Sequence, residues 1–212
     1  MTYDVGHLEN GKHYKGRSWG WIPPSQEVYD AFHYVKEKVN PKSVFEIGFY
    51  KGHSTSYWAQ TLPDARIFSC GPPHPNFVKF APKVISKYDN VIDIFPTKSP
   101  LVWEEMHILK DSRRYQQGKK QQYINFDFVF VDGLHTRHSV VLDTTLACDI
   151  LGANWVMFDN HEQNEVRIGI ETYGKLKLEQ VFPYEAKMWI KEEDGSETLQ
   201  INKLELALYC KI

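Results

Sequence analysis

The sequence has few cysteines, no long apolar run and little net charge, and each absence excludes a class of protein. Its three cysteines, Cys70, Cys148 and Cys210, are widely separated and odd in number, so they match neither a disulfide framework nor the paired spacing of a zinc site. No apolar run approaches the roughly 20 residues that cross a bilayer. The first residues also lack the apolar centre of a signal peptide. We therefore expect a cytoplasmic protein that does not associate with membranes.

The charge and the length narrow the choice further. A net charge of −2 over 212 residues gives no general attraction to the phosphates of nucleic acids. Four basic residues between 113 and 120 are interleaved with glutamine and glycine, which is typical of a solvated loop. The length suits one well-cored domain. We expect an irregular arm or lid over residues 1–22, one domain over residues 23–212, and no nucleic-acid partner.

Short apolar runs alternate with stretches of helical period along this domain. The runs are typical of buried strands and cover 43–48, 65–69, 91–95, 126–131 and 155–158. Helical spacing predicts helices over 25–39, 54–60, 77–88, 101–109 and 139–151, and Pro82 is expected to shorten or kink the third of these. Strands over 187–191 and 204–210 are expected to form a final hairpin. This order predicts an α/β fold with a single Rossmann-like, doubly wound sheet, mostly parallel with an antiparallel last strand.

The first candidate site follows the first of these strands. Gly48 and Gly52 allow the backbone to pass close to a ligand, and Ser54 and Thr55 begin a helix whose free N–H groups can face it. Glu46, at the end of the strand, can accept hydrogen bonds from a ribose or an amino group. A tight strand-to-helix turn without any ligand would use the same two glycines.

The second candidate site lies where two central strands each end in an acid. Asp132 follows one strand, and Asp159 and Asn160 follow the next. Because the carboxyl ends of neighbouring parallel strands meet at one edge, these side chains are expected to share a crevice. Carboxylate and amide oxygens suit Mg²⁺ or a similar divalent cation. A simple turn at Asp132 and a helix cap at Asp159 are the alternatives.

The segment from Glu46 to Gly52 reads acid-x-Gly-x-x-x-Gly, which resembles the first motif of class I S-adenosylmethionine-dependent methyltransferases. The resemblance runs from about residue 43 to the C-terminus and implies a seven-stranded sheet with S-adenosylmethionine as cofactor. It implies a cofactor site made of Glu46, Gly48, Tyr50, Gly52, Ser54, Thr55, Ser99 and Asp132, with Ser99 near the adenine ring.

The chain departs from this family at one position. The family usually ends its second strand with an acid that holds the ribose hydroxyls, but here that position falls on Cys70 or Gly71. Either the ribose is held by backbone or water, or the cofactor site is weakened.

Within that family, the two acidic strand ends resemble the metal-dependent O-methyltransferases of the catechol and sugar or macrolide types. Asp132 and the Asp159-Asn160 pair match their metal ligands. His135 completes an Asp-Gly-x-His pattern like that of the sugar-type enzymes, which implies that it is the general base. His138 and His161 flank the same region and could take its place, and a surface histidine is the plainer alternative for His135.

These observations together predict transfer of a methyl group from S-adenosylmethionine to a hydroxyl of a small molecule, assisted by Mg²⁺ or a similar ion. The reaction is an in-line displacement, so the protein mainly has to align its reactants. Assembly into a homo-oligomer is compatible with the sequence. Two alternatives keep the fold: a binding or regulatory protein without methyl transfer, and an enzyme that uses the metal site for another reaction.

Overall fold

Seven strands form one sheet in the computed structural model, which describes residues 3–4, 22–99, 125–191 and 196–212. The strand order is β3-β2-β1-β4-β5-β7-β6. The strands are β1 (Ser43–Ile47), β2 (Arg66–Cys70), β3 (Val91–Phe95), β4 (Phe128–Val131), β5 (Trp155–Phe158), β6 (Leu176–Lys191) and β7 (Glu197–Lys211). β1 to β5 are parallel, and β7 runs antiparallel to both β5 and β6. The predicted doubly wound sheet with an antiparallel last strand is confirmed.

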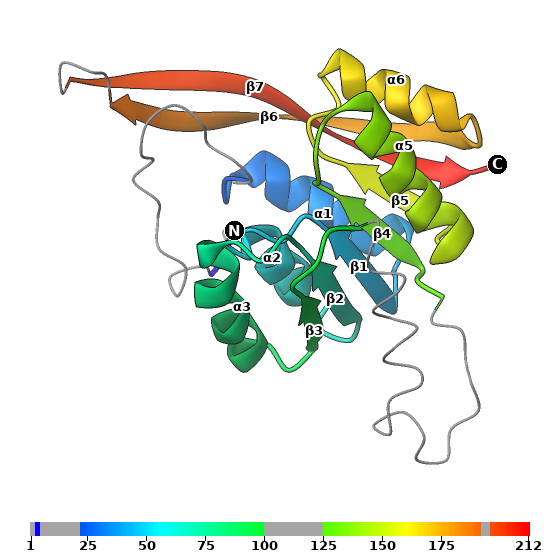
Figure 1. Ribbon diagram of the computed structural model, residues 1–212, viewed down its shortest axis with the longest axis horizontal. Coiled ribbons are helices and arrows are strands. Elements are labelled where there is room, and N and C mark those ends of the chain that lie inside the picture. The colour runs from blue at the N-terminus through cyan, green and yellow to red at the C-terminus, as the bar shows by residue number, and fades with distance from the viewer. Residues whose placement is uncertain (1–2, 5–21, 100–124, 192–195) are drawn as a thin grey trace.

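Helices cover both faces of this sheet (Figure 1). α1 (Gln26–Lys38), α2 (His53–Thr61) and α3 (Pro75–Lys87) bury their apolar residues in one hydrophobic cluster with alternate residues of the strands. α5 (Arg137–Thr145), its π-helical continuation η1 (Leu146–Ile150) and α6 (Asn164–Tyr173) do the same in a second cluster. Neighbouring strand residues such as Val44 and Phe45 belong to different clusters, as the period of two in a strand requires. The parallel strands are therefore covered on both sides.

The start of α1 shows how local sequence places an element. Ser25 caps the helix, because its Oγ accepts a hydrogen bond from the Val28 N–H at 3.3 Å. Val28, Phe32 and Val35 are fully buried, so the stripe at spacings of three and four faces the sheet as predicted. Asn40, with φ of 47°, ends the helix before β1.

Several element boundaries differ from those predicted. α3 runs from Pro75 to Lys87 with Pro82 inside it, so Pro82 does not end the helix. β4 begins at Phe128 rather than at 126, and the helix predicted over 139–151 begins at Arg137 and becomes π-helical at Leu146. α6 was not predicted, because its buried stripe is short and includes a glycine, Gly169. The helix predicted over 101–109 lies outside the described residues.

The final hairpin is much longer than predicted. β6 and β7 pair from Leu176 with Lys211 to Lys191 with Glu197, and their far ends project beyond the other strands (Figure 1). The predicted strands were too short because apolar residues of β6 and β7 alternate with charged ones instead of forming a continuous apolar run. The projecting part is not part of the core, since Leu199 and Ile201 are exposed. Near the sheet, by contrast, Tyr184 and Leu206 are buried, so the hairpin contributes to the core there.

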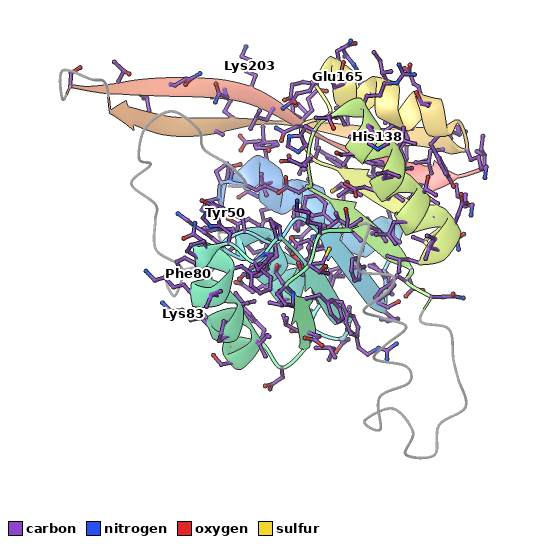
Figure 2. All side chains as sticks on the ribbon, in the orientation of Figure 1. Tyr50, Phe80, Lys83, His138, Glu165 and Lys203 are labelled. Carbon is purple, nitrogen blue, oxygen red and sulfur yellow. The ribbon has the colours of Figure 1, made fainter. Side chains whose placement is uncertain are left out.

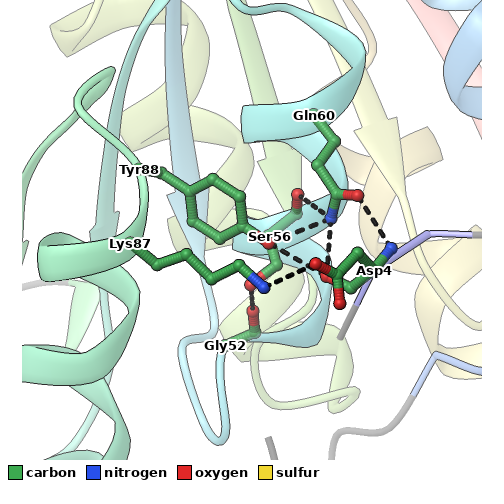
Figure 3. Close-up of polar contacts among 6 residues, drawn as sticks. All are labelled: Asp4, Gly52, Ser56, Gln60, Lys87 and Tyr88. Carbon is green, nitrogen blue, oxygen red and sulfur yellow. Dashed lines mark hydrogen bonds and ion pairs between the residues drawn. The ribbon is translucent and has the colours of Figure 1, made fainter. Parts of the chain in front are cut away.

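The described start of the chain is tied to α2 and α3. Asp4 exchanges hydrogen bonds with Gln60: its N–H donates to Oε1 at 2.8 Å, and its carbonyl accepts from Nε2 at 3.0 Å (Figure 3). Its carboxylate pairs with Lys87 Nζ at 2.8 Å. Tyr3 stacks on Tyr57 at 4.3 Å between ring centroids. Within the described parts of the chain, no helix combines the length and apolar character that a membrane crossing requires.

Candidate active site

The carboxyl ends of β1, β2 and β4 meet at one edge, and glycines allow their backbones to come very close. Gly48 has φ of 128°, and a Cβ there would lie 1.9 Å from the backbone oxygen of Asp132. The N–H groups of Gly48 and Phe49 both donate to the carbonyl of Cys70, at 2.9 and 2.7 Å. The turn after β1 is therefore held between the ends of β2 and β4, and Gly48 is required by this packing.

Gly71 explains the missing acid at the end of β2. A Cβ at Gly71 would lie 2.1 Å from the backbone oxygen of Phe49, so the position has no room for any side chain. Cys70, one residue earlier, is 1% exposed and lies in the hydrophobic cluster with α5 and α6. An acid at either place would conflict with packing on this edge of the sheet.

Glu46 is fully buried at the end of β1. Its Oε2 accepts hydrogen bonds from Ser69 Oγ at 2.6 Å and from Thr55 Oγ1. Burial raises the pKa of this carboxyl, although the hydroxyls of Ser54, Ser69 and Thr55 oppose the shift. Oε1 has no hydrogen-bond partner among the described residues. Thr55 therefore holds Glu46 in place, and Oε1 is the acceptor atom that remains for a ligand.

The remaining residues of the first site surround the start of α2. Gly52 adopts φ of 85° at the N-terminus of this helix, and Ser54 is buried in its first turn. Tyr50 is half-buried in the turn, with its ring centroid 5.5 Å from that of His74, which caps α3 (Figure 2). The structure thus brings together the predicted residues from Glu46 to Thr55 at the carboxyl edge.

The second site also forms as one cluster. Asp132, His135 and Asp159 each offer one ligand atom, and these atoms lie within 4.8 Å of one another. His135 Nε2 is 3.6 Å from Asp132 Oδ1. Asp159 does not cap a helix, because the cap of α6 is Gln163, four residues further on. Asn160 follows it in the left-handed region, with φ of 55°.

The two carboxyl groups of this cluster are buried, and burial raises the pKa of both well above the ordinary value for aspartate. Asp132 is raised further by the negative charge of Glu46, and Asp159 by that of Asp132. Two adjacent buried carboxylates are stabilised by a shared proton or by a cation. Two buried carboxylates fit a divalent ion as donors, and a ring nitrogen of His135 lies within 4.8 Å of their oxygens, beside the place where such an ion would bind.

The two neighbouring histidines differ from His135. His138 is exposed on α5 (Figure 2). His161 is buried and bonded on both ring nitrogens, Nδ1 with Glu205 Oε2 at 3.1 Å and Nε2 with Tyr209 Oη at 2.9 Å. His135 is the histidine that lies in the carboxylate cluster.

The sequence did not point to two further residues of this region. Tyr184 reaches in from β6, and its Oη donates to Asp159 Oδ1 at 2.7 Å. Asp143 on α5 is 2% exposed and accepts a hydrogen bond from Ser99 Oγ. Tyr184 shares one face of β6 with Phe182 and Ala186, and this spacing of two could have marked a strand with a buried face. Nothing in the sequence predicts that its hydroxyl contacts Asp159.

A family model described as a methyltransferase domain matches residues 45–161, which is more than half of the chain. The chain belongs to this methyltransferase family. The match includes both candidate sites, from the turn after β1 to the residues that follow β5. No curated protein matches the sequence.

Solved structures share the methyltransferase fold at low identity. The O-methyltransferase TomG from Streptomyces achromogenes, in complex with S-adenosylmethionine, is 16% identical with a TM-score of 0.52, over 90% of this chain and 83% of that one. An O-methyltransferase from Bacillus cereus with S-adenosylhomocysteine is 13% identical with a TM-score of 0.54, over 88% and 82%. A Pyrococcus horikoshii protein named as a candidate RNA methyltransferase is 10% identical with a TM-score of 0.60, over 96% and 94%. At such identities the likeness establishes the fold alone.

Proposed function

We propose that this methyltransferase transfers a methyl group from S-adenosylmethionine to a hydroxyl oxygen of a small molecule, assisted by a divalent cation. The observation that carries the proposal is the cluster of Asp132, His135 and Asp159, whose ligand atoms lie within 4.8 Å of one another. The cluster adjoins the glycine turn after β1, because Gly48 packs against the backbone of Asp132. Cofactor and acceptor would therefore meet at the edge where ligands bind in sheets of this kind.

The turn from Glu46 to Thr55 is the proposed cofactor site. Gly48 and Gly52 both have positive φ, so the chain can bend closely around a ligand. Glu46 Oε1 is buried without a partner in the described part of the chain, and a ligand donor would satisfy it. Two O-methyltransferases of this fold carry S-adenosylmethionine or its product, which supports the same cofactor here.

Asp132 and Asp159 would hold the cation, with Asn160 beside them. A bound divalent ion supplies charge that draws a hydroxyl group into place and makes it more acidic. The two carboxylates would bind the ion and so orient the acceptor hydroxyl, and their burial keeps competing water away from them. Tyr184 fixes the orientation of Asp159 through its hydrogen bond.

His135 would take the proton of the acceptor hydroxyl. Its Nε2 is buried 3.6 Å from Asp132 Oδ1 and has no hydrogen-bond partner among the described residues, so it can accept a proton from a group that binds in the cluster. The net charge of −2 supports a small-molecule acceptor over a nucleic acid.

The test has a binding arm and a turnover arm. We would titrate S-adenosylmethionine and S-adenosylhomocysteine by calorimetry with and without Mg²⁺. We would then assay methyl transfer to catechol and to sugar diols, with RNA as the competing acceptor and EDTA to remove the ion. Asp159→Ala is expected to abolish the metal-dependent turnover. Asp149→Ala is the matched control, because this exposed acid pairs with Lys175 and Lys211, outside the cluster.

The missing ribose acid at Cys70-Gly71 favours a second candidate, a binding or regulatory protein with this fold and no methyl transfer. Absence of S-adenosylhomocysteine binding under both conditions would support that candidate. Methylation of RNA with no diol product would overturn the small-molecule acceptor. Turnover that persists in EDTA would overturn the role of the cation.

A further inference from the structure

The hairpin of β6 and β7 continues past the sheet with one edge of β7 open. β7 pairs with β5 as far as Ala207, which lies opposite Phe158, and no described strand borders β7 on that side between Glu197 and Ala207. The ribbon projects beyond the other strands (Figure 1). A two-stranded ribbon is only marginally stable when no further strand or helix packs against it. A third strand along β7 would therefore stabilise the projecting part.

The backbone groups that face this open edge belong to alternate residues of β7. The Glu205 carbonyl accepts a hydrogen bond from the His161 N–H at 3.0 Å, and the Glu205 N–H donates to Glu162 Oε2 at 2.9 Å. Both groups of Glu205 therefore point away from β6. Because the direction of the backbone groups alternates along a strand, those of Leu199 and Ile201 point the same way. They face the side on which another strand could add.

The two long edges of the ribbon differ in how they are protected. Pro183 lies opposite Glu205, so it faces the outer edge of β6, where it has no N–H to donate. Proline and charged residues are common on edges that do not pair with other chains. Residues 198–202 of β7 include neither, and Leu199 and Ile201 are 45% and 50% exposed. The edge of β7 is therefore the one suited to pairing.

We propose that β7 pairs edge to edge with β7 of a second copy of this chain, antiparallel and centred on Gln200. In this register Leu199 lies opposite Ile201 of the partner subunit, and Ile201 opposite the partner's Leu199. The backbone groups of both residues face the open edge, so each such pair can exchange two hydrogen bonds. The four apolar side chains share one face of the joined ribbons. Both copies use the same surface, as a two-fold symmetric dimer requires.

The charges of the strand favour this register over its neighbours. It places Lys203, which is exposed (Figure 2), opposite Glu197 of the partner subunit at each end of the paired segment. Within one hairpin Glu197 lies opposite Lys191 and Lys203 opposite Glu185, so acids and lysines alternate across the four strands. A shift of two residues toward the sheet would set Glu197 against the partner's Glu205, and like charges directly opposite are destabilising. A shift the other way leaves Lys203 with no acid opposite.

The oligomeric state of the full chain tests the proposal. Sedimentation equilibrium of the wild type is expected to show a dimer in the micromolar range. Ile201→Pro removes an N–H that would face the partner, and we expect it to weaken the dimer roughly 10-fold or more. The bonds from β7 to β6 belong to the alternate residues, so the hairpin keeps them. Lys187→Pro is the matched control: residue 187 lies opposite Ile201, its N–H faces the other edge of the ribbon, and the dimer should be unchanged.

Two charge variants test the register. Lys203→Glu sets acid against acid, and Glu197→Lys sets lysine against lysine, so each variant alone is expected to dimerise roughly 10-fold or more weakly than the wild type. An equal mixture of the two variants restores opposite charges at both ends of the segment. We expect it to form a heterodimer about as stable as the wild-type dimer. Rescue on mixing cannot come from better folding of either chain alone.

Each outcome bears on a different part of the proposal. A wild type that stays monomeric throughout the micromolar range overturns it. A dimer that Ile201→Pro leaves intact, or that Lys187→Pro weakens equally, overturns the choice of the β7 edge. If the two charge variants are not rescued by mixing, the centre on Gln200 is wrong. Thermal unfolding of each variant shows whether the fold is kept, and none of these measurements depends on a cofactor or a metal.

Discussion

Tyr184 Oη donates a hydrogen bond to Asp159 Oδ1 at 2.7 Å, which ties the final hairpin to the end of β5. Both side chains are buried. Tyr184 belongs to β6, which begins at Leu176, 17 residues after Asp159. A buried phenol normally finds a partner, but this partner is a carboxylate of the proposed metal cluster. The hairpin therefore contributes to the site as well as to the core.

We expect Tyr184→Phe to weaken divalent-ion binding by roughly 10-fold, because partners that orient a ligand typically contribute 10- to 100-fold in affinity. The phenol ring is kept, so packing changes little. Loss of the bond also removes an interaction that lowers the pKa of Asp159. Calorimetric titration of Mn²⁺ into the wild type and the variant measures the difference.

Tyr209→Phe is the matched control for this measurement. It also removes a buried hydroxyl, but one bonded to His161 Nε2 at 2.9 Å instead of to a carboxylate of the cluster. Its Mn²⁺ affinity is expected to equal that of the wild type. Equal affinity in Tyr184→Phe would show that the Asp159 bond only stabilises the hairpin.

Removal of one carboxylate from the cluster is expected to change stability in opposite directions with and without metal. Asp132 and Asp159 are buried side by side, so Asp159→Asn relieves like-charge repulsion and should raise the Tm of the metal-free protein. The wild type should gain about 2.7 kcal/mol at a metal concentration 100 times its Kd, and the variant should lose most of that gain. Thermal unfolding with EDTA and with Mn²⁺ measures both effects. A variant with a lower Tm in EDTA and an unchanged response to Mn²⁺ would contradict the cluster as a metal site.

The sequence was sufficient for the order of the five parallel strands and for placing Glu46, Asp132 and Asp159 at the ends of three of them, whereas α6 was not predicted. β3 and β5 lie where their apolar runs predicted, and β5 shows the clear signal of a central strand covered on both faces. Glu46, Asp132 and Asp159 lie together because parallel strands end at one edge. These inferences depend only on local sequence patterns and on the rule that the carboxyl ends of neighbouring parallel strands meet at one edge of the sheet.

Contacts between distant segments could not be predicted in this way. The bond from Ser99 to Asp143 and that from Tyr184 to Asp159 join residues 44 and 25 positions apart, and their geometry depends on how helices and strands pack. The close approach of Gly71 to Phe49 is likewise a property of the assembled sheet edge. A missing acid in the sequence could therefore be noticed but not explained.

We expect Gly71→Ala to destabilise the protein by about 3 kcal/mol or more, the upper range for overpacked positions. Its Cβ would lie 2.1 Å from the backbone oxygen of Phe49, and a backbone atom cannot move aside as a side chain can. Gly174→Ala is a suitable control, since its nearest contact would be an ordinary 3.6 Å and only its φ of 73° is unfavourable. Urea unfolding of the three proteins gives the free energies. If Gly71→Ala is no less stable than Gly174→Ala, packing does not explain the missing acid.

The pH dependence of stability offers a test of Asp143. Its pKa is raised from 3.8 to about 6 in the folded protein, mainly by burial, with the Ser99 hydroxyl and His135 opposing the shift. Between these two values the folded state binds more protons than the unfolded state, so the free energy of unfolding falls as pH rises through this window. The destabilisation caused by ionisation of the buried carboxyl is complete well above the folded-state pKa of about 6 and absent well below the unfolded-state pKa of 3.8. A neutral isostere should therefore matter only at the higher pH.

Asp143→Asn is accordingly expected to be more stable than the wild type at pH 8, by on the order of 1–2 kcal/mol once the weaker bond to Ser99 is included. At pH 4 the wild-type carboxyl is protonated in the folded state and close to half protonated in the unfolded state, so most of the difference should disappear and the two proteins should unfold at similar urea concentrations. Comparison of the two proteins at each pH cancels the titration of groups that do not interact with Asp143. An Asn variant that is less stable at pH 8 than at pH 4, relative to the wild type, would mean that Asp143 is stabilised as a carboxylate. In that case its bond to Ser99 would outweigh the cost of burial.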